Sequence, residues 1–263
     1  MPSQTAETPD ILARIIRRIR EDELGLFENT TTDIFRPAER TRPRDILTTL
    51  GGGFAVIAEI KKGSPSRGRI RDIADPAALA RDYEAGGAAA VSVVTEKNFF
   101  LGDKADLGRV RDAVSLPILR KDFIFHPAQV HESFDLGADF ILLIASILHK
   151  NDIASLLEIC RGLGMEALVE VHGAEDLERA LGAGARLIGI NNRDLRDFSV
   201  DWTHALRLRK GVPPGIPVIA ESGIRSPDQV RTLRDRGFAG VLVGEHLLRQ
   251  KNPGQALREL LHG

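Results

Sequence analysis

The chain has 263 residues, of which 43% are hydrophobic, 28% charged and 5% aromatic, which is typical of a globular protein. Its 36 basic and 37 acidic side chains leave a formal charge of −1, which excludes a global field that drives binding to nucleic acid or an anionic membrane. The longest apolar run covers residues 140–148, too short for a bilayer, which needs about 20 residues. The single Cys160 excludes an intramolecular disulfide and fits a reducing compartment, so we expect a cytoplasmic protein.

The N-terminal segment predicts an amphipathic helix over residues 11–20. Isoleucines four residues apart share one face and arginines cover the other, with Thr8 or Asp10 as the expected N-cap. A secretory signal would need a continuous apolar core, and the neighbouring acidic residues argue against a mitochondrial presequence. We therefore expect an extra helix packed on the domain, joined to it by the connecting segment 29–44.

Short apolar runs then alternate with helical patterns. Eight runs predict strands, at residues 54–60, 89–94, 117–119, 140–145, 167–171, 187–190, 217–220 and 240–243. Eight stretches predict helices, at residues 76–85, 107–113, 127–136, 152–163, 174–181, 202–208, 227–236 and 253–261. This alternation predicts a parallel sheet with helices packed on it.

A longer period in the glycines and prolines distinguishes between two such architectures. Glycines expected to be left-handed helix caps precede the even-numbered strands, at intervals of 50, 47 and 53 residues; they are Gly87, Gly137, Gly184 and Gly237. Strands three and seven open with Pro117 and Pro217, 100 residues apart. A period of two βα units suits a closed barrel, whose core layers draw on alternate strands. A doubly wound open sheet is the alternative, but its glycine fingerprint after the first strand is missing. We predict an α/β fold of one domain over residues 1–263, a (β/α)8 TIM barrel at 51–263 whose mouth is covered by a helical extension at 1–50.

Charged and polar side chains stand where five of the predicted strands end. They are Glu59 and Lys61 on the first strand, Lys121 on the third, Glu170 on the fifth, Asn191 and Arg193 after the sixth, and Glu221 on the seventh. In such barrels the carboxyl ends of the strands carry the catalytic groups. A single charge there is often merely solvated, but inward charges in a set must neutralise one another or meet a ligand. The set therefore predicts a catalytic mouth.

Three glycine-containing turns near the same mouth predict a phosphate site. Ser222 and Gly223 follow the seventh strand, Gly244 follows the eighth, and Lys61 and Ser64 lie in the loop after the first. Backbone N–H groups at glycines can approach an anion closely, and lysine supplies a mobile positive charge. Three ordinary turns are the alternative interpretation.

The remaining candidates are aromatic or weak. Phe100 and Phe123 fall just past strands two and three, where they could enclose a planar aromatic ligand or simply pack in the core. The histidines show no HExxH motif and no clustering with Cys160, so we expect no metal site. His126, His149 and His246 read as loop residues, Cys160 as buried and inert, and Trp202 as packing.

Six short strings together resemble one family. They lie at residues 58–66 (AEIKKGSPS), 92–100, 121–124 (KDFI), 170, 189–195 (GINNRDL) and 220–224 (AESGI). In order and spacing they are similar to the motifs of the indole-3-glycerol-phosphate synthases of tryptophan biosynthesis. The resemblance implies a carboxy-lyase without cofactor, acting on 1-(2-carboxyphenylamino)-1-deoxyribulose 5-phosphate. The enzyme would close the pyrrole ring and release CO2 and water.

The resemblance also implies roles for the mouth residues. Lys121 would protonate the ketone oxygen during ring closure, and Glu170 would act as a base in the dehydration, with Lys61 as proton donor. Glu59 would hold Lys121 or Lys61. The other implied contacts are Asn191 and Arg193 orienting the substrate, Glu221 lining the site, Lys61, Ser64, Ser222, Gly223 and Gly244 holding the phosphate, and Phe100, Phe123 and Leu142 walling the anthranilate pocket.

Three further expectations complete this interpretation. A free lysine has a pKa of about 10.4, so we expect burial or the charge of Lys61 to lower the pKa of Lys121.

We expect a monomer, with weak association with other tryptophan-pathway enzymes as the alternative. The competing functions are a Schiff-base aldolase with Lys121 as nucleophile, another phosphate-binding barrel enzyme such as phosphoribosylanthranilate isomerase, and a ligand-binding barrel without catalysis.

Overall fold

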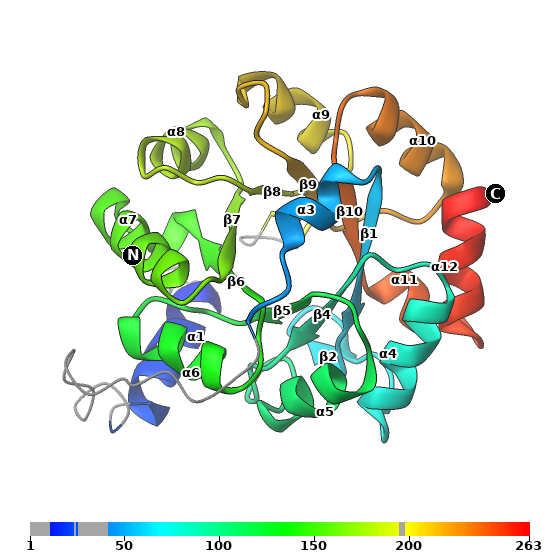
Figure 1. Cartoon of the computed structure of the whole chain (residues 1–263), viewed down its shortest axis with the longest axis horizontal. Coiled ribbons are helices and arrows are strands. Elements are labelled where there is room, and N and C mark those ends of the chain that lie inside the picture. The colour runs from blue at the N-terminus through cyan, green and yellow to red at the C-terminus, as the bar shows by residue number, and fades with distance from the viewer. Residues whose placement is uncertain (1–10, 24, 26–41, 195–197) are drawn as a thin grey trace, which may run out of the picture.

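Parallel strands close into a barrel in the computed structural model, which describes residues 11–23, 25, 42–194 and 198–263 (Figure 1). The barrel strands are β1 (Ala55–Ile60), β4 (Ala90–Val94), β5 (Ile118–Lys121), β6 (Phe140–Ile144), β7 (Glu166–Val171), β8 (Ile188–Asn191), β9 (Val218–Glu221) and β10 (Gly240–Val243). The first strand, β1, pairs with both β4 and the last strand, β10. An open doubly wound sheet is thereby excluded, and the predicted (β/α)8 barrel is confirmed.

Helices follow each barrel strand, and Figure 1 shows them ringed around the strands. They are α4 (Pro76–Ala85), α5 (Ala105–Ala113), α6 (Pro127–Asp135), α7 (Lys150–Gly162), α8 (Ala174–Gly182), α9 (His204–Leu208), α10 (Pro227–Asp235) and α12 (Pro253–His262). Their bounds agree with the predictions to within two residues. The positions that the sequence predicted as glycine caps are left-handed, with φ between 75° and 101°.

Several short elements were not predicted. They are α3 (Ile46–Gly51), α11 (Glu245–Leu248), the 3₁₀ turns η1 (Ala145–Ile147) and η2 (Arg209–Gly211), and the hairpin of β2 (Gly63–Ser64) with β3 (Gly68–Arg69). Each is too short to show a hydrophobic period. Asp45 caps α3 by accepting hydrogen bonds from the backbone N–H groups of Leu47 and Thr48.

Alternate residues of each strand face two different cores. The inner face fills the barrel with apolar side chains such as Ile57, Leu119 and Ile219. The outer face packs against the helices, as Val56 and Ala220 do. Side chains two residues apart on a strand share a face, so the charged residues at the strand ends lie directly above the apolar side chains that fill the barrel.

The predicted N-terminal helix is present as α1 (Ile11–Asp22), with Ile15 and Ile19 buried. It borders the mouth, because its C-terminal end meets the loops after β4 and β5. Asp22 accepts a hydrogen bond from Asn98, and the guanidinium of Arg20 lies 5.4 Å from the centroid of the Phe125 ring. The predicted caps Thr8 and Asp10 lie outside the described residues. No helix in the described part of the chain is long and apolar enough to cross a membrane.

Candidate active site

A layer of charged side chains closes the apolar filling at the carboxyl end of the barrel. Glu59, Lys121, Glu170 and Glu221 come from the alternate strands β1, β5, β7 and β9. Such a layer of four side chains from alternate strands is characteristic of this architecture. The three carboxylates are at most 3% exposed. The set predicted from the sequence is therefore brought together.

Ion pairs join these charges across the barrel. The Nζ of Lys121 lies 3.2 Å from Oε2 of Glu170 and 3.3 Å from Oε2 of Glu221. Lys61 pairs with Glu59 on its own strand end. Of the two partners expected for Glu59, the structure selects Lys61. Within this cluster three carboxylates face two ammonium groups, so it carries an excess of carboxyl groups.

The charge state of the cluster follows from that excess. Burial alone lowers the pKa of Lys121, but the carboxylates of Glu221, Glu170 and Glu59 outweigh it and raise that pKa above its usual value. The expectation of a lowered pKa for Lys121 is therefore wrong, because Lys61 is taken up by Glu59 while carboxylates surround Lys121. Burial raises the pKa of Glu221 to about 8, despite the nearby charge of Lys121. Burial alone raises the pKa of Glu170, but the charges of Lys121 and His172 outweigh it and hold the pKa of that carboxyl below its usual range. Lys121 and Glu170 are therefore both shifted toward their charged forms, whereas Glu221 is shifted toward its neutral form.

Two glycines make room for the buried carboxylates. A Cβ on Gly189 of β8 would lie 2.2 Å from Oε1 of Glu221, and one on Gly244 would lie 2.2 Å from Oε2 of Glu59. Real Cβ atoms do not approach this closely, so any side chain at either position displaces a carboxylate. The sequence predicted Gly244 as a phosphate-binding residue. The structure shows that a glycine at this position leaves room for the carboxylate of Glu59.

The predicted phosphate residues gather on one side of the same pocket. Lys61, Ser64, Ser222, Gly223 and Gly244 all line it. Ser222 and Gly223 both have left-handed backbone, with φ of 66° and 81°. A serine rarely adopts this conformation, and such strain concentrates at functional sites.

The aromatic residues also border this pocket. The rings of Phe100 and Phe123 lie with centroids 5.9 Å apart and planes tilted by 46°, and Leu142 lines the pocket as well. The buried carboxylate of Glu96 accepts hydrogen bonds from the backbone N–H groups of Phe99 and Phe100, at 2.7 and 2.9 Å. It fixes the loop that carries Phe100. The two rings therefore lie against a cavity rather than sealed in the core.

All the predicted site residues line this one pocket, including Asn191 and Arg193 after β8. Other lining residues were not predicted; they include Ser66, Glu96, Arg225, Glu245 and His246. Glu245 lies 3.7 Å from the guanidinium of Arg193. His246, expected in a loop, lies in α11, and burial and Arg225 lower its pKa. Arg225 follows β9, and Glu245 and His246 follow β10, so the residues singled out beside them could have indicated these three.

A histidine beside the charged layer also escaped sequence analysis. The Nε2 of His172 lies 3.6 Å from Oε1 of Glu170, whereas Lys121 pairs with the other oxygen of that carboxylate, Oε2. It follows β7 by one residue, so its position two residues after Glu170 could have suggested this contact. Trp202, Cys160 and the remaining predicted packing residues are buried or partly buried against the outer core, as expected.

Comparisons with known proteins identify the family of the chain. The family profile described as indole-3-glycerol phosphate synthase matches residues 14–260. An indole-3-glycerol phosphate synthase of Carboxydothermus hydrogenoformans is 51% identical over 80% of this chain and 80% of its own length. One of Desulfotalea psychrophila is 43% identical over 95% of this chain and 98% of its own.

Solved structures that resemble the chain show the barrel alone. A thiamine phosphate pyrophosphorylase from Pyrococcus furiosus has a TM-score of 0.60 at 19% identity, covering 82% of this chain and 96% of its own. KGPDC from Streptococcus mutans has a TM-score of 0.61 at 15% identity, covering 79% and 95%. The extent of the profile match and the identity to two relatives, each matched over at least 80% of its length, establish the family: the chain belongs to the indole-3-glycerol phosphate synthases.

Proposed function

We propose that this pocket converts 1-(2-carboxyphenylamino)-1-deoxyribulose 5-phosphate into indole-3-glycerol phosphate, CO2 and water, in tryptophan biosynthesis. Membership in the indole-3-glycerol phosphate synthase family, a family of carboxy-lyases, supports the overall reaction. The observation that carries the assignment of residues is the position of Lys121. Its ammonium group, paired with Glu170 and Glu221, lies in a pocket lined by aromatic side chains from the loops after β4 and β5 and by glycine-containing turns after β9 and β10, on the other side of the strand ring.

Ring closure requires a proton on the ketone oxygen as the ring carbon bearing the carboxylate attacks the carbonyl carbon. Lys121 is charged in the free site and supplies that proton. Its raised pKa does not prevent transfer, because the alkoxide that develops in the transition state is a stronger base than the amine left behind. Loss of CO2 then restores the aromatic ring.

Dehydration removes the new hydroxyl group together with a proton from the intermediate. Glu170, which is ionised, takes up the proton, and Lys61 delivers one to the departing hydroxyl so that it leaves as water. Glu59 holds Lys61 in place for this step. Protons given by the two lysines and taken by the carboxylate are returned through solvent before the next turnover.

The two ends of the pocket bind the two ends of the substrate. Phe100, Phe123 and Leu142 enclose the anthranilate ring, since apolar walls favour a flat aromatic group. Lys61, Ser64, Ser222, Gly223 and Gly244 hold the phosphate. Asn191 and Arg193 orient the chain of the substrate and its carboxylate.

Indole fluorescence tests the reaction directly. The purified protein is mixed with the substrate, without added metal or cofactor, and the emission of the product is followed. A rise proportional to enzyme concentration is expected. Substrate binding without a rise would mean a ligand-binding barrel, and no binding would mean that the ligand is wrong.

The Schiff-base alternative makes an opposite prediction about Lys121. An imine requires an uncharged amine, whereas the surrounding carboxylates hold this one protonated. Borohydride added during turnover should therefore leave the enzyme active and unmodified. Covalent trapping on Lys121, detected by mass spectrometry, would support the aldolase class instead.

We further infer a cytoplasmic enzyme that acts as a monomer on a small phosphorylated substrate. A single cysteine, the buried Cys160, fits a reducing compartment. Light scattering of the purified protein measures its mass, and a dimer mass would contradict the monomer.

A further inference from the structure

A ten-residue segment of the chain occurs twice, 100 residues apart. Residues 121–130 read KDFIFHPAQV and residues 221–230 read ESGIRSPDQV, with isoleucine, proline, glutamine and valine at the same offsets. Each copy starts on the last residue of a strand, β5 or β9, and runs into the helix that follows, α6 or α10. These two strands stand four places apart in the ring of eight, on opposite sides of the barrel. The proposed mechanism uses the start of each copy and leaves the glutamine at its end unexplained.

That glutamine makes the same three hydrogen bonds in both copies. The Oε1 of Gln129 accepts from the backbone N–H groups of Phe125 and His126, at 2.9 and 3.0 Å, and its Nε2 donates to the carbonyl of Phe123 at 3.2 Å. The Oε1 of Gln229 accepts from the N–H groups at 225 and 226, at 2.7 and 3.2 Å, and its Nε2 donates to the carbonyl of Gly223 at 3.2 Å. The two accepted bonds cap a helix; the donated bond reaches back to the turn at the pocket.

We propose that Gln129 and Gln229 are paired positioning residues, one holding the turn that carries the aromatic wall and the other the turn that binds the phosphate. The proposal rests on the proposed function for the identity of the two substrate ends. Neither glutamine lines the pocket, so each acts through the residue whose carbonyl it holds: Phe123 or Gly223. A capping box needs only the bond accepted from the N-cap N–H, that of His126 or Ser226, and no donated bond.

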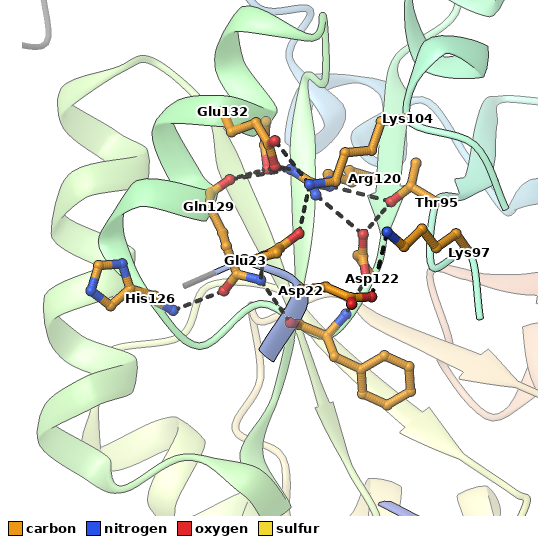
Figure 2. A network of polar contacts seen from close by, with 12 residues as sticks. Asp22, Glu23, Thr95, Lys97, Lys104, Arg120, Asp122, His126, Gln129 and Glu132 are labelled. Carbon is orange, nitrogen blue, oxygen red and sulfur yellow. Dashed lines mark hydrogen bonds and ion pairs between the residues drawn. The ribbon is translucent and has the colours of Figure 1, made fainter. Parts of the chain in front are cut away.

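On the aromatic side the peptide groups on both sides of Phe123 are held. Its N–H donates to Oδ1 of Asp122 at 2.9 Å, and its carbonyl accepts from Gln129. Asp122 is in turn paired with the fully buried Arg120 at 3.2 Å. Figure 2 shows Asp122, Arg120 and Gln129 within one network of polar contacts, in which Arg120 also donates to the backbone carbonyl of Gln129. The ring of Phe123 is therefore placed by the backbone on both sides of its Cα.

The N-terminal helix joins this copy of the turn. The Nε2 of Gln129 also donates to Oε2 of Glu23 at 2.9 Å, and Oε1 of Glu23 accepts from Lys104 at 2.6 Å (Figure 2). Lys104 pairs in addition with Glu132 of α6. The clamp on Phe123 is thus braced by a segment about 100 residues earlier in the chain.

On the phosphate side the clamp acts on a strained turn. Ser222 and Gly223 have left-handed backbone, and a Cβ at position 223 would lie 2.6 Å from Cγ1 of Val200. Holding the carbonyl of Gly223 fixes the peptide that joins it to Ile224, and with it the direction of the neighbouring N–H group. An anion site made of backbone N–H groups depends on that direction.

Two substitutions separate the clamp from the cap. Gln229→Glu keeps an acceptor for the two N–H groups, as glutamate does in capping boxes, but cannot donate to Gly223. Gln229→Met removes all three bonds and adds no charge. Gln129→Glu and Gln129→Met make the same changes on the aromatic side and also remove the bond to Glu23, so Gln129→Met, which adds no carboxylate beside Glu23, is the cleaner control for Gln229→Met.

The measurements are the affinity for inorganic phosphate, by calorimetry, and KM and kcat for the full substrate. Both Gln229 variants should weaken phosphate binding about three- to tenfold, the factor that one ordinary hydrogen bond provides. Both Gln129 variants should leave phosphate affinity within twofold of the wild type and raise KM for the substrate by about the same three to ten times. The glutamate variant at 229 should unfold within about 2 °C of the wild type, since its cap remains.

Several results would overturn the proposal. Unchanged phosphate affinity in Gln229→Met would mean that Gln229 serves only as a helix cap. A loss of affinity that occurs only in Gln229→Glu and disappears at high salt would mean that the added negative charge repels the phosphate. Equal loss of phosphate affinity in the Gln129 and Gln229 variants would show general loosening. Phosphate calorimetry needs no turnover, so an inactive wild-type protein would refute the proposed reaction without deciding the clamp at Gly223.

Discussion

The ammonium group of Lys121 lies between two glutamate carboxyl groups in the free protein. The barrel mouth therefore holds a charged proton donor in a largely buried site. Glu170 and Glu221 lie at almost equal distances from it, 3.2 and 3.3 Å, yet their pKa values shift in opposite directions. One proton on Glu221 relieves the repulsion between the two carboxyl groups. The pair is therefore divided into a stronger acid, Glu170, and a weaker acid, Glu221.

Removal of the Lys121 side chain should affect turnover more than binding. Lys121→Ala is expected to lower kcat by about 10²- to 10⁴-fold, the usual contribution of a general acid, while KM changes by less than about tenfold. Steady-state kinetics by indole fluorescence measure both constants. Lys210→Ala, an exposed lysine in η2 before β9 at the opposite end of the barrel, is the control and should leave both unchanged. Full turnover in Lys121→Ala would remove this residue from the mechanism.

The raised pKa of Glu221 predicts a pH dependence of stability. The folded protein holds this proton up to about pH 8, whereas the unfolded chain releases it near the ordinary value of 4.5. The contribution of Glu221 is therefore fully present below pH 4.5 and is lost as pH rises to 8, with a slope of up to about 1.4 kcal/mol per pH unit. In Glu221→Gln the free energy of unfolding should fall less over this range. Urea unfolding at pH 5, 6, 7 and 8 compares the two slopes, and identical slopes would mean that Glu221 is ionised in the folded protein.

At the scale of single elements, the helices end where the sequence places a glycine in left-handed conformation. Gly184 after α8 has φ of 85°, and the atom nearest to a Cβ added there would be Nη2 of Arg161, 3.8 Å away. Gly108, by contrast, lies inside α5 with open space where a Cβ would be. The same residue type thus serves a conformational purpose at one position and none at the other.

These two glycines should respond oppositely to alanine. Gly184→Ala is expected to lower the free energy of unfolding by about 1 kcal/mol, because a Cβ disfavours positive φ. Gly108→Ala should raise it by about 0.5–1 kcal/mol, since alanine is the better helix former. Chemical denaturation of both variants measures the changes, and kcat should stay at the wild-type value in each. Stabilisation by Gly184→Ala would contradict the left-handed cap.

For the molecule as a whole, stability and chemistry occupy opposite ends of the barrel. Asp139, just before β6, is 1% exposed and accepts from the backbone of Arg44 at 2.8 Å and of Ile118 at 2.9 Å, and it pairs with Arg111. It joins the segment before α3 to two strands at their amino ends. No residue of this cluster lines the pocket.

Loss of this carboxylate should destabilise the protein without changing its chemistry. Asp139→Ala leaves Arg111 with a poorly compensated charge and is expected to cost about 3 kcal/mol or more of folding free energy. Thermal unfolding measures the loss, and kcat of the folded fraction should equal that of the wild type. Asp228→Ala removes an exposed pair with Arg231 and should change stability by no more than about 0.5 kcal/mol. A fall in kcat with unchanged stability would place Asp139 in the function of the mouth.

Much of the fold was accessible from the sequence because its signals are local. Apolar runs, helical periods and glycine caps each involve residues within a few positions of one another, so the barrel strands and their helices were found to within a few residues. The third strand was predicted to end at Leu119, but β5 extends to Lys121 because Arg120 is buried on its outer face by Asp122 and Glu132. The short elements α3, α11, η1, η2 and the β2–β3 hairpin carried no period and were missed.

The sequence alone determined that glutamates and lysines would meet at the mouth, because strand parity and the common direction of parallel strands require it. Only the tertiary structure decided which of them pair. Glu59 takes Lys61 from its own strand end, and Lys121 takes Glu170 and Glu221 from strands far along the chain. That choice reversed the expected direction of the pKa shift of Lys121 and raised the pKa of Glu221. Electrostatic energies depend on distances of a few ångströms between residues that may be 100 positions apart, and no local pattern contains those distances.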